Sequence, residues 1–100
     1  MSFKRWGCDF DGPWPNTQIL KSRKGIWVIW RRTGYQWDVI EVGESANIQA
    51  SLAKPELQPT LPPGRGQIYY SATYTPRLSE TARRNLARRI RKVSNHHQSV

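Results

Sequence analysis

The fold is decided by residues 25–42, which read GIWVIWRRTGYQWDVIEV. The first part of this segment is β-branched and aromatic, with apolar side chains on both faces, a pattern typical of a strand in the middle of a sheet. Thr33 and Gly34 fit a tight turn. Residues 35–42 then alternate apolar and polar side chains, as a second strand does. The segment therefore predicts a β-hairpin.

Two shorter elements and a loop follow the hairpin. A short helix is expected to begin at Glu44 and Ser45, which supply an acid and a capping hydroxyl, and to end before Pro55. Residues 55–66 are rich in proline and glycine and predict a loop. Residues 67–75 resume the alternation of a strand, so a third strand is expected there.

The last predicted element is a helix that opens at Pro76 or at the cap residue Ser79 and ends by Val93. Its apolar side chains recur at intervals of four and three residues, which places them on one face toward a core. These residues are Leu78, Ala82, Leu86, Ile90 and Val93. We expect Leu86 and Ile90 to be buried against the first strand of the hairpin.

Together these elements predict an α+β fold, a small antiparallel sheet of three or four strands with two or three flanking helices. One hundred residues suffice for one domain, which we place at residues 25–93. Residues 1–24 are broken by glycine and proline, so they are expected to form a loop-rich segment packed on the domain. Its aromatic anchors, with base stacking as their alternative role, are Trp6, Phe10 and Trp14. Residues 94–100 are expected to be a flexible tail.

The charge of the chain is strongly positive, with 16 lysines and arginines against 7 acids and a formal net charge of +9. Such a charge favours polyanionic partners.

No apolar run approaches the roughly 18 residues of a membrane span, so no membrane partner is expected. No signal peptide is recognisable, and we therefore expect a cytoplasmic protein. The single cysteine, Cys8, excludes an intramolecular disulfide framework and a cysteine-cluster zinc site.

The positive charge is concentrated on the last helix, where Glu80 is the only acid within residues 77–92. The side chains opposite the apolar stripe are Arg84, Arg88, Arg91 and Lys92. Arginine forks suit phosphate oxygens, so we expect this face to bind the phosphate backbone of nucleic acid, with Arg23 and Lys24 as a second contact. The alternatives are a merely solvated face and a surface for an acidic protein partner.

A third pattern consists of two tripeptides and a following asparagine. The tripeptides are Gly25-Ile26-Trp27 and Glu41-Val42-Gly43, and Asn47-Ile48 follows on the first predicted helix. This order resembles the GIY-YIG nuclease family, in which two strands carry the named tripeptides and a helix with an Asn-Leu-like pair follows. The resemblance covers residues 25–54 and implies the same α+β fold.

The resemblance also implies that catalytic groups are missing. Trp27 and Glu41 stand in place of the two motif tyrosines, and Ser51 stands at the position of the family's catalytic arginine. No acid lies near Asn85, where the family's metal-binding glutamate is expected. We therefore expect a degenerate, non-catalytic relative that needs no cofactor.

The alternative within that family is an active nuclease with relocated residues. Cleavage of a phosphodiester builds charge on the phosphorus oxygens, which a cation and a divalent metal ion stabilise. In this alternative Glu80 or Glu44 would hold a Mg²⁺ or Mn²⁺ ion.

Overall fold

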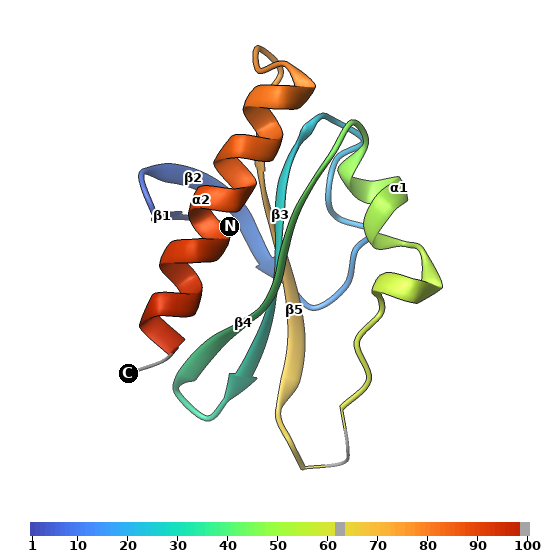
Figure 1. The fold of residues 1–100 in the computed structure, drawn as a ribbon. Coiled ribbons are helices and arrows are strands. Elements are labelled where there is room, and N and C mark those ends of the chain that lie inside the picture. Colours follow the sequence, from blue (N-terminus) through green and yellow to red (C-terminus); the bar gives the residue numbers. More distant parts are fainter. Residues whose placement is uncertain (62–63, 99–100) are drawn as a thin grey trace.

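The described part of the chain contains five strands, two α-helices and one 3₁₀ helix. They are β1 (Ser2–Arg5), β2 (Cys8–Trp14), β3 (Gly25–Thr33), β4 (Gln36–Ser45), α1 (Ile48–Leu52), the 3₁₀ helix η1 (Pro55–Leu57), β5 (Gln67–Tyr74) and α2 (Glu80–Gln98). The computed structural model describes residues 1–61 and 64–98, with side chains described as far as residue 94. The strands form one antiparallel sheet in the order β1-β2-β5-β3-β4 (Figure 1). The expected α+β class is confirmed, with a five-stranded sheet in place of three or four strands.

The predicted hairpin is confirmed as β3 and β4. The two strands pair from Gly25 opposite Ser45 to Thr33 opposite Gln36. Between them, Gly34 adopts a φ of +61°, in the left-handed region that glycine enters without strain. The third predicted strand is β5, which pairs with the other side of β3. β3 therefore lies between two neighbours, as its apolar sequence indicates.

Residues 1–24 form more regular structure than the expected loop, because β1 and β2 make a second hairpin that extends the sheet beyond β5. Trp6 and Gly7 form its turn, with φ angles of +50° and +75°. The prediction was wrong because Gly12 and Pro13 lie inside β2 and interrupt its alternation. The strand accommodates them at a shift of register against β5, where the missing N–H of proline disrupts little of the ladder.

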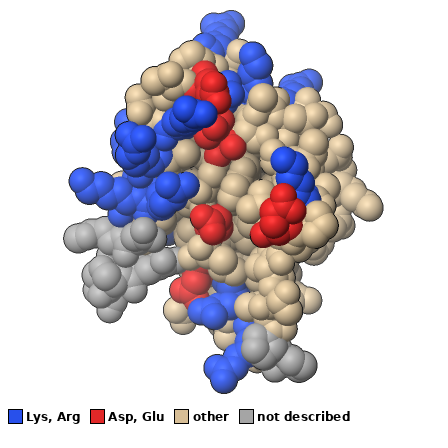
Figure 2. Space-filling model, turned by 45° about the vertical axis from the view of Figure 1, so that its right-hand side comes forward, with Lys and Arg blue, Asp and Glu red and all other residues tan. Residues whose placement is uncertain are grey.

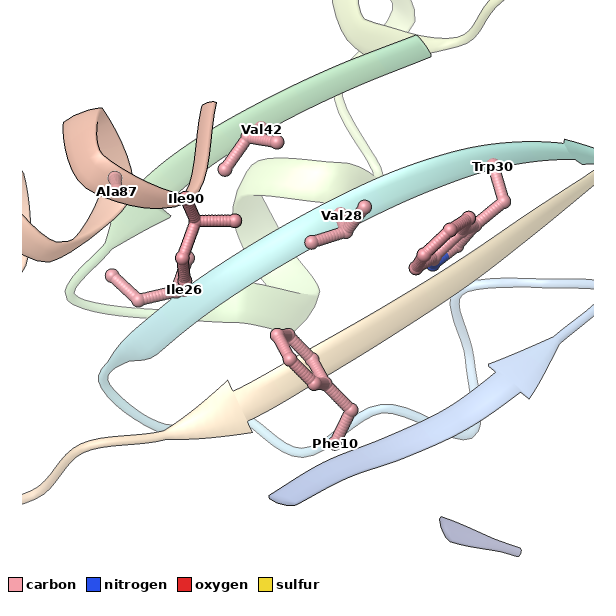
Figure 3. Close-up of a cluster of buried hydrophobic side chains, with 7 residues drawn as sticks. All are labelled: Phe10, Ile26, Val28, Trp30, Val42, Ala87 and Ile90. Atoms are coloured by element: carbon pink, nitrogen blue, oxygen red, sulfur yellow. The ribbon is translucent and has the colours of Figure 1, made fainter. Parts of the chain in front are cut away.

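Two apolar clusters fill the two faces of the sheet. The cluster under α2 consists of Phe10, Ile26, Val28, Trp30, Val42, Ala87 and Ile90 (Figure 3). The cluster on the face of α1 consists of Leu20, Trp27, Ile29, Ile48, Leu52, Tyr70 and Ala72. Successive residues of β3 alternate between the two clusters, as side chains of a strand do. This alternation explains why the sequence of β3 is apolar without interruption.

The buried face of α2 differs from the predicted stripe. Its buried side chains are Arg83, Ala87, Ile90 and Ser94. The prediction is right for Ile90 and only partly right for Leu86, which is half-buried at the edge of the cluster. Val93 is 39% exposed. The face turns toward Arg83 because an ion pair with Glu44 allows a guanidinium to be buried there.

The first helix begins later than expected. Asn47 caps α1, since its Oδ1 accepts a hydrogen bond from the N–H of Ala50 at 3.1 Å. Ser45, the expected cap, is the last residue of β4, and its Oγ accepts a hydrogen bond from the N–H of Asn47 at 2.9 Å. The turn between β4 and α1 is thus held by two polar side chains in succession.

The last helix begins as expected and ends later. Ser79 precedes α2, and its Oγ accepts a hydrogen bond from the N–H of Ala82. The helix continues to Gln98 because no glycine or proline interrupts residues 94–98. The expected tail is therefore helical over these residues, and residues 99–100 lie outside the described chain. No helix in the described ranges is long and apolar enough to cross a membrane.

Candidate functional site

A cleft of about 460 Å³ lies between α2 and β4. Its α2 wall is formed by Arg84, Arg88 and Arg91, with Ala87 between them. These arginines share one side of the helix because they are four and three residues apart. The opposite wall is the end of β4 with Trp27 of β3, and Leu57 of η1 closes one side. We call this hollow the α2 cleft.

The three arginines of the α2 cleft differ in how they are held. Arg84 donates from Nη2 to Glu80 Oε1 at 2.8 Å, and its Nε lies 3.7 Å from Glu44 Oε1. Arg91 donates from Nη2 to the carbonyl oxygen of Val42 at 2.5 Å. These contacts fix two guanidinium groups along the wall of the cleft.

Arg88 is the arginine of this wall that the described chain holds least tightly, and, like Arg91, it has no carboxylate partner there. Its Nη1 donates to Asn85 Oδ1 at 3.5 Å, and no carboxylate lies within ion-pair distance of it in residues 1–61 and 64–94. From residue 81 onward every formally charged side chain of α2 is basic. The middle and end of the helix therefore present positive charge, and Figure 2 shows lysine and arginine side chains gathered on this side of the molecule.

The structure brings together three of the six basic residues expected to contact phosphate. Lys92 is exposed on α2 but does not line the α2 cleft. Arg23 and Lys24 are exposed in the loop before β3 and do not line it either. Three of the four helical residues of the predicted face therefore line a concave surface, and Lys92, Arg23 and Lys24 lie outside it.

Arg83 is the residue of this region that the sequence analysis missed. Its side chain is 6% exposed, and its Nε donates to Glu44 Oε2 at 3.1 Å. Its Nη1 also donates to the carbonyl oxygen of Leu78 at 3.3 Å. The sequence spacing could have revealed this position, because Arg83 lies four residues before Ala87 and therefore on the same, core-facing side of the helix. Arg83 thus joins α2 to the end of β4.

The positions matched to the nuclease family lie in two different places. Trp27 and Glu41 both line the α2 cleft. Ser51 is half-buried on α1, where its Oγ lies 2.5 Å from the Oγ of Ser45. Trp27 is 6% exposed, and its indole lies across Gly43 on the neighbouring strand. The cleft thus holds an indole and a carboxylate at the two motif positions, and the hydroxyl of Ser51 is bound within the turn.

The two candidate metal ligands do not fit a divalent ion. Glu44 is paired with Arg83 and Arg84, and Glu80 is paired with Arg84 as well. Within the described residues there is no group of three histidine, cysteine, aspartate or glutamate side chains close enough to hold a metal. A Mg²⁺ or Mn²⁺ ion would have to compete with an arginine for each of these carboxylates.

Cys8 also lacks the setting of a nucleophile. Burial raises the pKa of its thiol, and the nearby Arg89 offsets this only in part. A raised pKa keeps the thiol protonated, whereas a reactive cysteine needs the thiolate.

A comparison with protein-family models finds no match to the chain, and comparisons with curated proteins and with solved structures likewise find none. The function is therefore inferred from the charge, contacts and shape of the α2 cleft.

Proposed function

We propose that this protein is a non-catalytic nucleic-acid-binding domain that holds the phosphate backbone in the α2 cleft. The observation that carries the proposal is the state of Arg88, which lines the cleft without a carboxylate partner in the described chain. An arginine that lines a concave surface and has no carboxylate partner can donate hydrogen bonds to phosphate oxygens. Arg84 and Arg91 flank it and add further donors.

The restraint of the flanking arginines supports the same function. Ordering a long side chain at an interface reduces affinity. Arg84 and Arg91 are already ordered by Glu80 and by the carbonyl of Val42. Glu44 also lines the cleft, but two arginines neutralise it. The acid that still opposes an anion there is Glu41, which limits the expected affinity to that of a weak, salt-sensitive contact.

The side chains at the positions matched to the GIY-YIG family support the proposal that this domain binds nucleic acid without cleaving it. Hydrolysis of a phosphodiester requires charge stabilisation at the phosphorus oxygens and an activated water. Ser51 offers a hydroxyl already bound to Ser45, and Glu44 and Glu80 are bound to arginines. In this proposal the chain is a degenerate relative of the GIY-YIG nucleases that keeps their ligand and has lost their reaction.

The experiment is fluorescence anisotropy of a labelled nucleic acid across a salt series, with wild type, Arg88→Ala and Arg65→Ala. Arg65 is exposed in the loop before β5 and serves as a control with the same loss of charge. Because each phosphate contact releases counterions, Arg88→Ala should make the slope of log K against log salt shallower by about 0.7 to 0.9. Arg65→Ala should leave the slope near the wild-type value. Equal effects of the two variants, or no binding by wild type at low salt, would contradict the proposal.

A further inference from the structure

A second hollow, of about 250 Å³, has three aromatic side chains in its lining. Trp30 of β3, Phe3 of β1 and Trp37 of β4 surround it, with Pro13 and Arg5 at its border. The rings of Phe3 and Trp37 stand at 73° and 88° to the indole of Trp30, with centroids 6.0 and 6.2 Å from it. Because β1 and β4 are the two edges of the sheet, these rings approach Trp30 from opposite directions. We call this hollow the aromatic pocket.

The floor of the aromatic pocket is rigid. Trp30 is 3% exposed, and its Nε1 donates to the Oγ of the buried Ser71 at 2.8 Å. Trp6 stacks on Trp30 at an interplanar angle of 7°. Trp37, by contrast, is 36% exposed. The pocket thus pairs a fixed indole with a second indole that solvent reaches, and the exposed part of Trp37 offers an aromatic surface on which a flat ring can stack.

The charge at its border selects the kind of ring. Aromatic pockets often hold quaternary ammonium ions. Here the guanidinium of Arg5 lies 5.1 Å from the ring centroid of Trp6 and 5.8 Å from that of Trp30. Arg5 has no carboxylate partner in the described part of the chain, and the whole chain carries a formal charge of +9. A cationic ligand is therefore repelled, and a flat ring attached to an anion is favoured.

Two smaller hollows connect the aromatic pocket to the α2 cleft. The first, of about 170 Å³, shares Glu41, Val42 and Arg91 with the α2 cleft. The second, of about 210 Å³, shares Ser94 with the first and Trp37 with the aromatic pocket. Three of the four hollows, the α2 cleft among them, lie between β4 and α2, and Glu41 and Asp38 are among their lining residues. The aromatic pocket contains no residue of α2 and adjoins the end of this row at Trp37.

The geometry points to single-stranded nucleic acid as the ligand, with one unpaired base stacked in the aromatic pocket and phosphates of the same strand in the α2 cleft. This inference rests on the proposed function and narrows its ligand class. In a duplex each base is paired and stacked inside the helix, and it reaches such a pocket only if it is flipped out. A single strand offers bases and phosphates together, which is the combination that aromatic platforms beside a basic groove recognise.

The test compares a labelled oligothymidylate of about ten nucleotides, a length typical of single-strand sites, with a duplex of equal length. Binding is measured by anisotropy for wild type, Trp37→Ala, Trp37→Phe and Tyr35→Ala. Tyr35 is 99% exposed at the tip of the same hairpin and is absent from the pocket lining, so it is the matched aromatic control. Circular dichroism establishes that each variant is folded.

The expected result is a selective loss at the aromatic pocket. Trp37→Ala should weaken single-strand binding by about 5- to 150-fold, the range for loss of one stacked base. Trp37→Phe should restore most of it, and Tyr35→Ala should bind as wild type does. Duplex binding should change less than about twofold in all three variants. Arg5→Ala should also weaken single-strand binding. Because Arg5 is exposed, this variant provides a second test of the aromatic pocket if Trp37→Ala does not fold.

The outcomes separate this inference from the proposed function. If wild type binds neither oligonucleotide, the proposed function fails and this inference fails with it. A second outcome is that wild type binds both oligonucleotides and Arg88→Ala weakens both, while Trp37→Ala and Arg5→Ala leave single-strand binding unchanged. In that case the proposed function stands and the stacking site in the aromatic pocket is overturned. Tighter binding to the duplex than to the single strand also overturns it.

Discussion

The indole of Trp27 lies across Gly43, its pairing partner on β4, so closely that a Cβ at position 43 would overlap the ring atoms Cζ2 and Cε2. Gly43 is thus required by the bulk of the residue opposite it. Gly43→Ala should lower the free energy of unfolding by about 1–3 kcal/mol, the usual cost of overpacking. Adding Trp27→Leu should make the alanine nearly harmless, because the obstructing ring is gone. Urea unfolding of the two single variants and the double variant measures this coupling, and strictly additive losses would show that the ring is not the obstacle.

The ion pair between Arg83 and Glu44 should matter far more than the ion pair between Arg84 and Glu80. Glu44→Ala leaves a buried guanidinium unpaired, which typically costs about 3–5 kcal/mol. Glu80→Ala removes an exposed pair on one helix face, which is usually worth about 0.3–0.5 kcal/mol. Thermal and urea unfolding of the two variants should therefore differ clearly. Similar midpoints would mean that Arg83 finds water or another acceptor.

Purified protein should not cleave nucleic acid in the presence of Mg²⁺ or Mn²⁺. The reason is that Glu44 and Glu80 are bound by arginines and Ser51 cannot supply a positive charge. Supercoiled plasmid incubated with the protein should stay supercoiled, with and without a chelator. Nicking that the chelator stops and that Glu44→Ala or Glu80→Ala abolishes would establish the nuclease alternative.

The phenol of Tyr74 should make stability fall at high pH. Its O–H donates to Asp11 Oδ2 at 2.7 Å, and its oxygen accepts from the N–H of Lys21 at 2.9 Å. Burial raises the pKa of Tyr74 to about 12, above the value of about 10 in an unfolded chain. The folded state therefore holds this proton more tightly. Its contribution to stability is complete below about pH 10 and is lost as the pH rises through about 12.

Comparison with Tyr74→Phe tests this assignment. The variant has no phenolic proton at this position, so the stability advantage of wild type over it should shrink between about pH 9 and about pH 11. Chemical unfolding at both pH values gives the two differences. A constant difference would assign the alkaline loss of stability to other groups.

The central hairpin and the order of the later elements could be predicted because local patterns decide them. The alternation in β4 and the apolar run in β3 are visible in the sequence. The turn was predicted one residue too early, since Thr33 pairs with Gln36 and the turn is formed by Gly34 and Tyr35. The hairpin of β1 and β2 could not be predicted, because Gly12 and Pro13 interrupt its alternation and are accommodated only through a shift of register against β5, which is distant in the sequence.

The candidate site was predictable to the extent that one helix supplies it. Arg84, Arg88 and Arg91 follow from helical spacing alone. The phase of α2 depends on Glu44, which lies 39 residues before Arg83 in the chain and meets it only in the folded state. The aromatic pocket likewise depends on Phe3 and Trp37, from opposite edges of the sheet, lining one hollow, a relation that no local stretch of sequence contains.

The order in which the strands are synthesised differs from the order in which they can pair. The β1–β2 hairpin is made before the other strands, yet β2 joins the sheet by pairing with β5. The hydrogen bond between Asp11 and Tyr74 likewise joins residues that are 63 positions apart in the sequence. Contacts this distant in sequence form slowly. The β1–β2 hairpin therefore cannot join the sheet until β5 is made, and the core around Phe10 stays incomplete until α2 supplies Ala87 and Ile90. A chaperone that recognises exposed aromatic residues would find its target in the β1–β2 hairpin before β5 is synthesised.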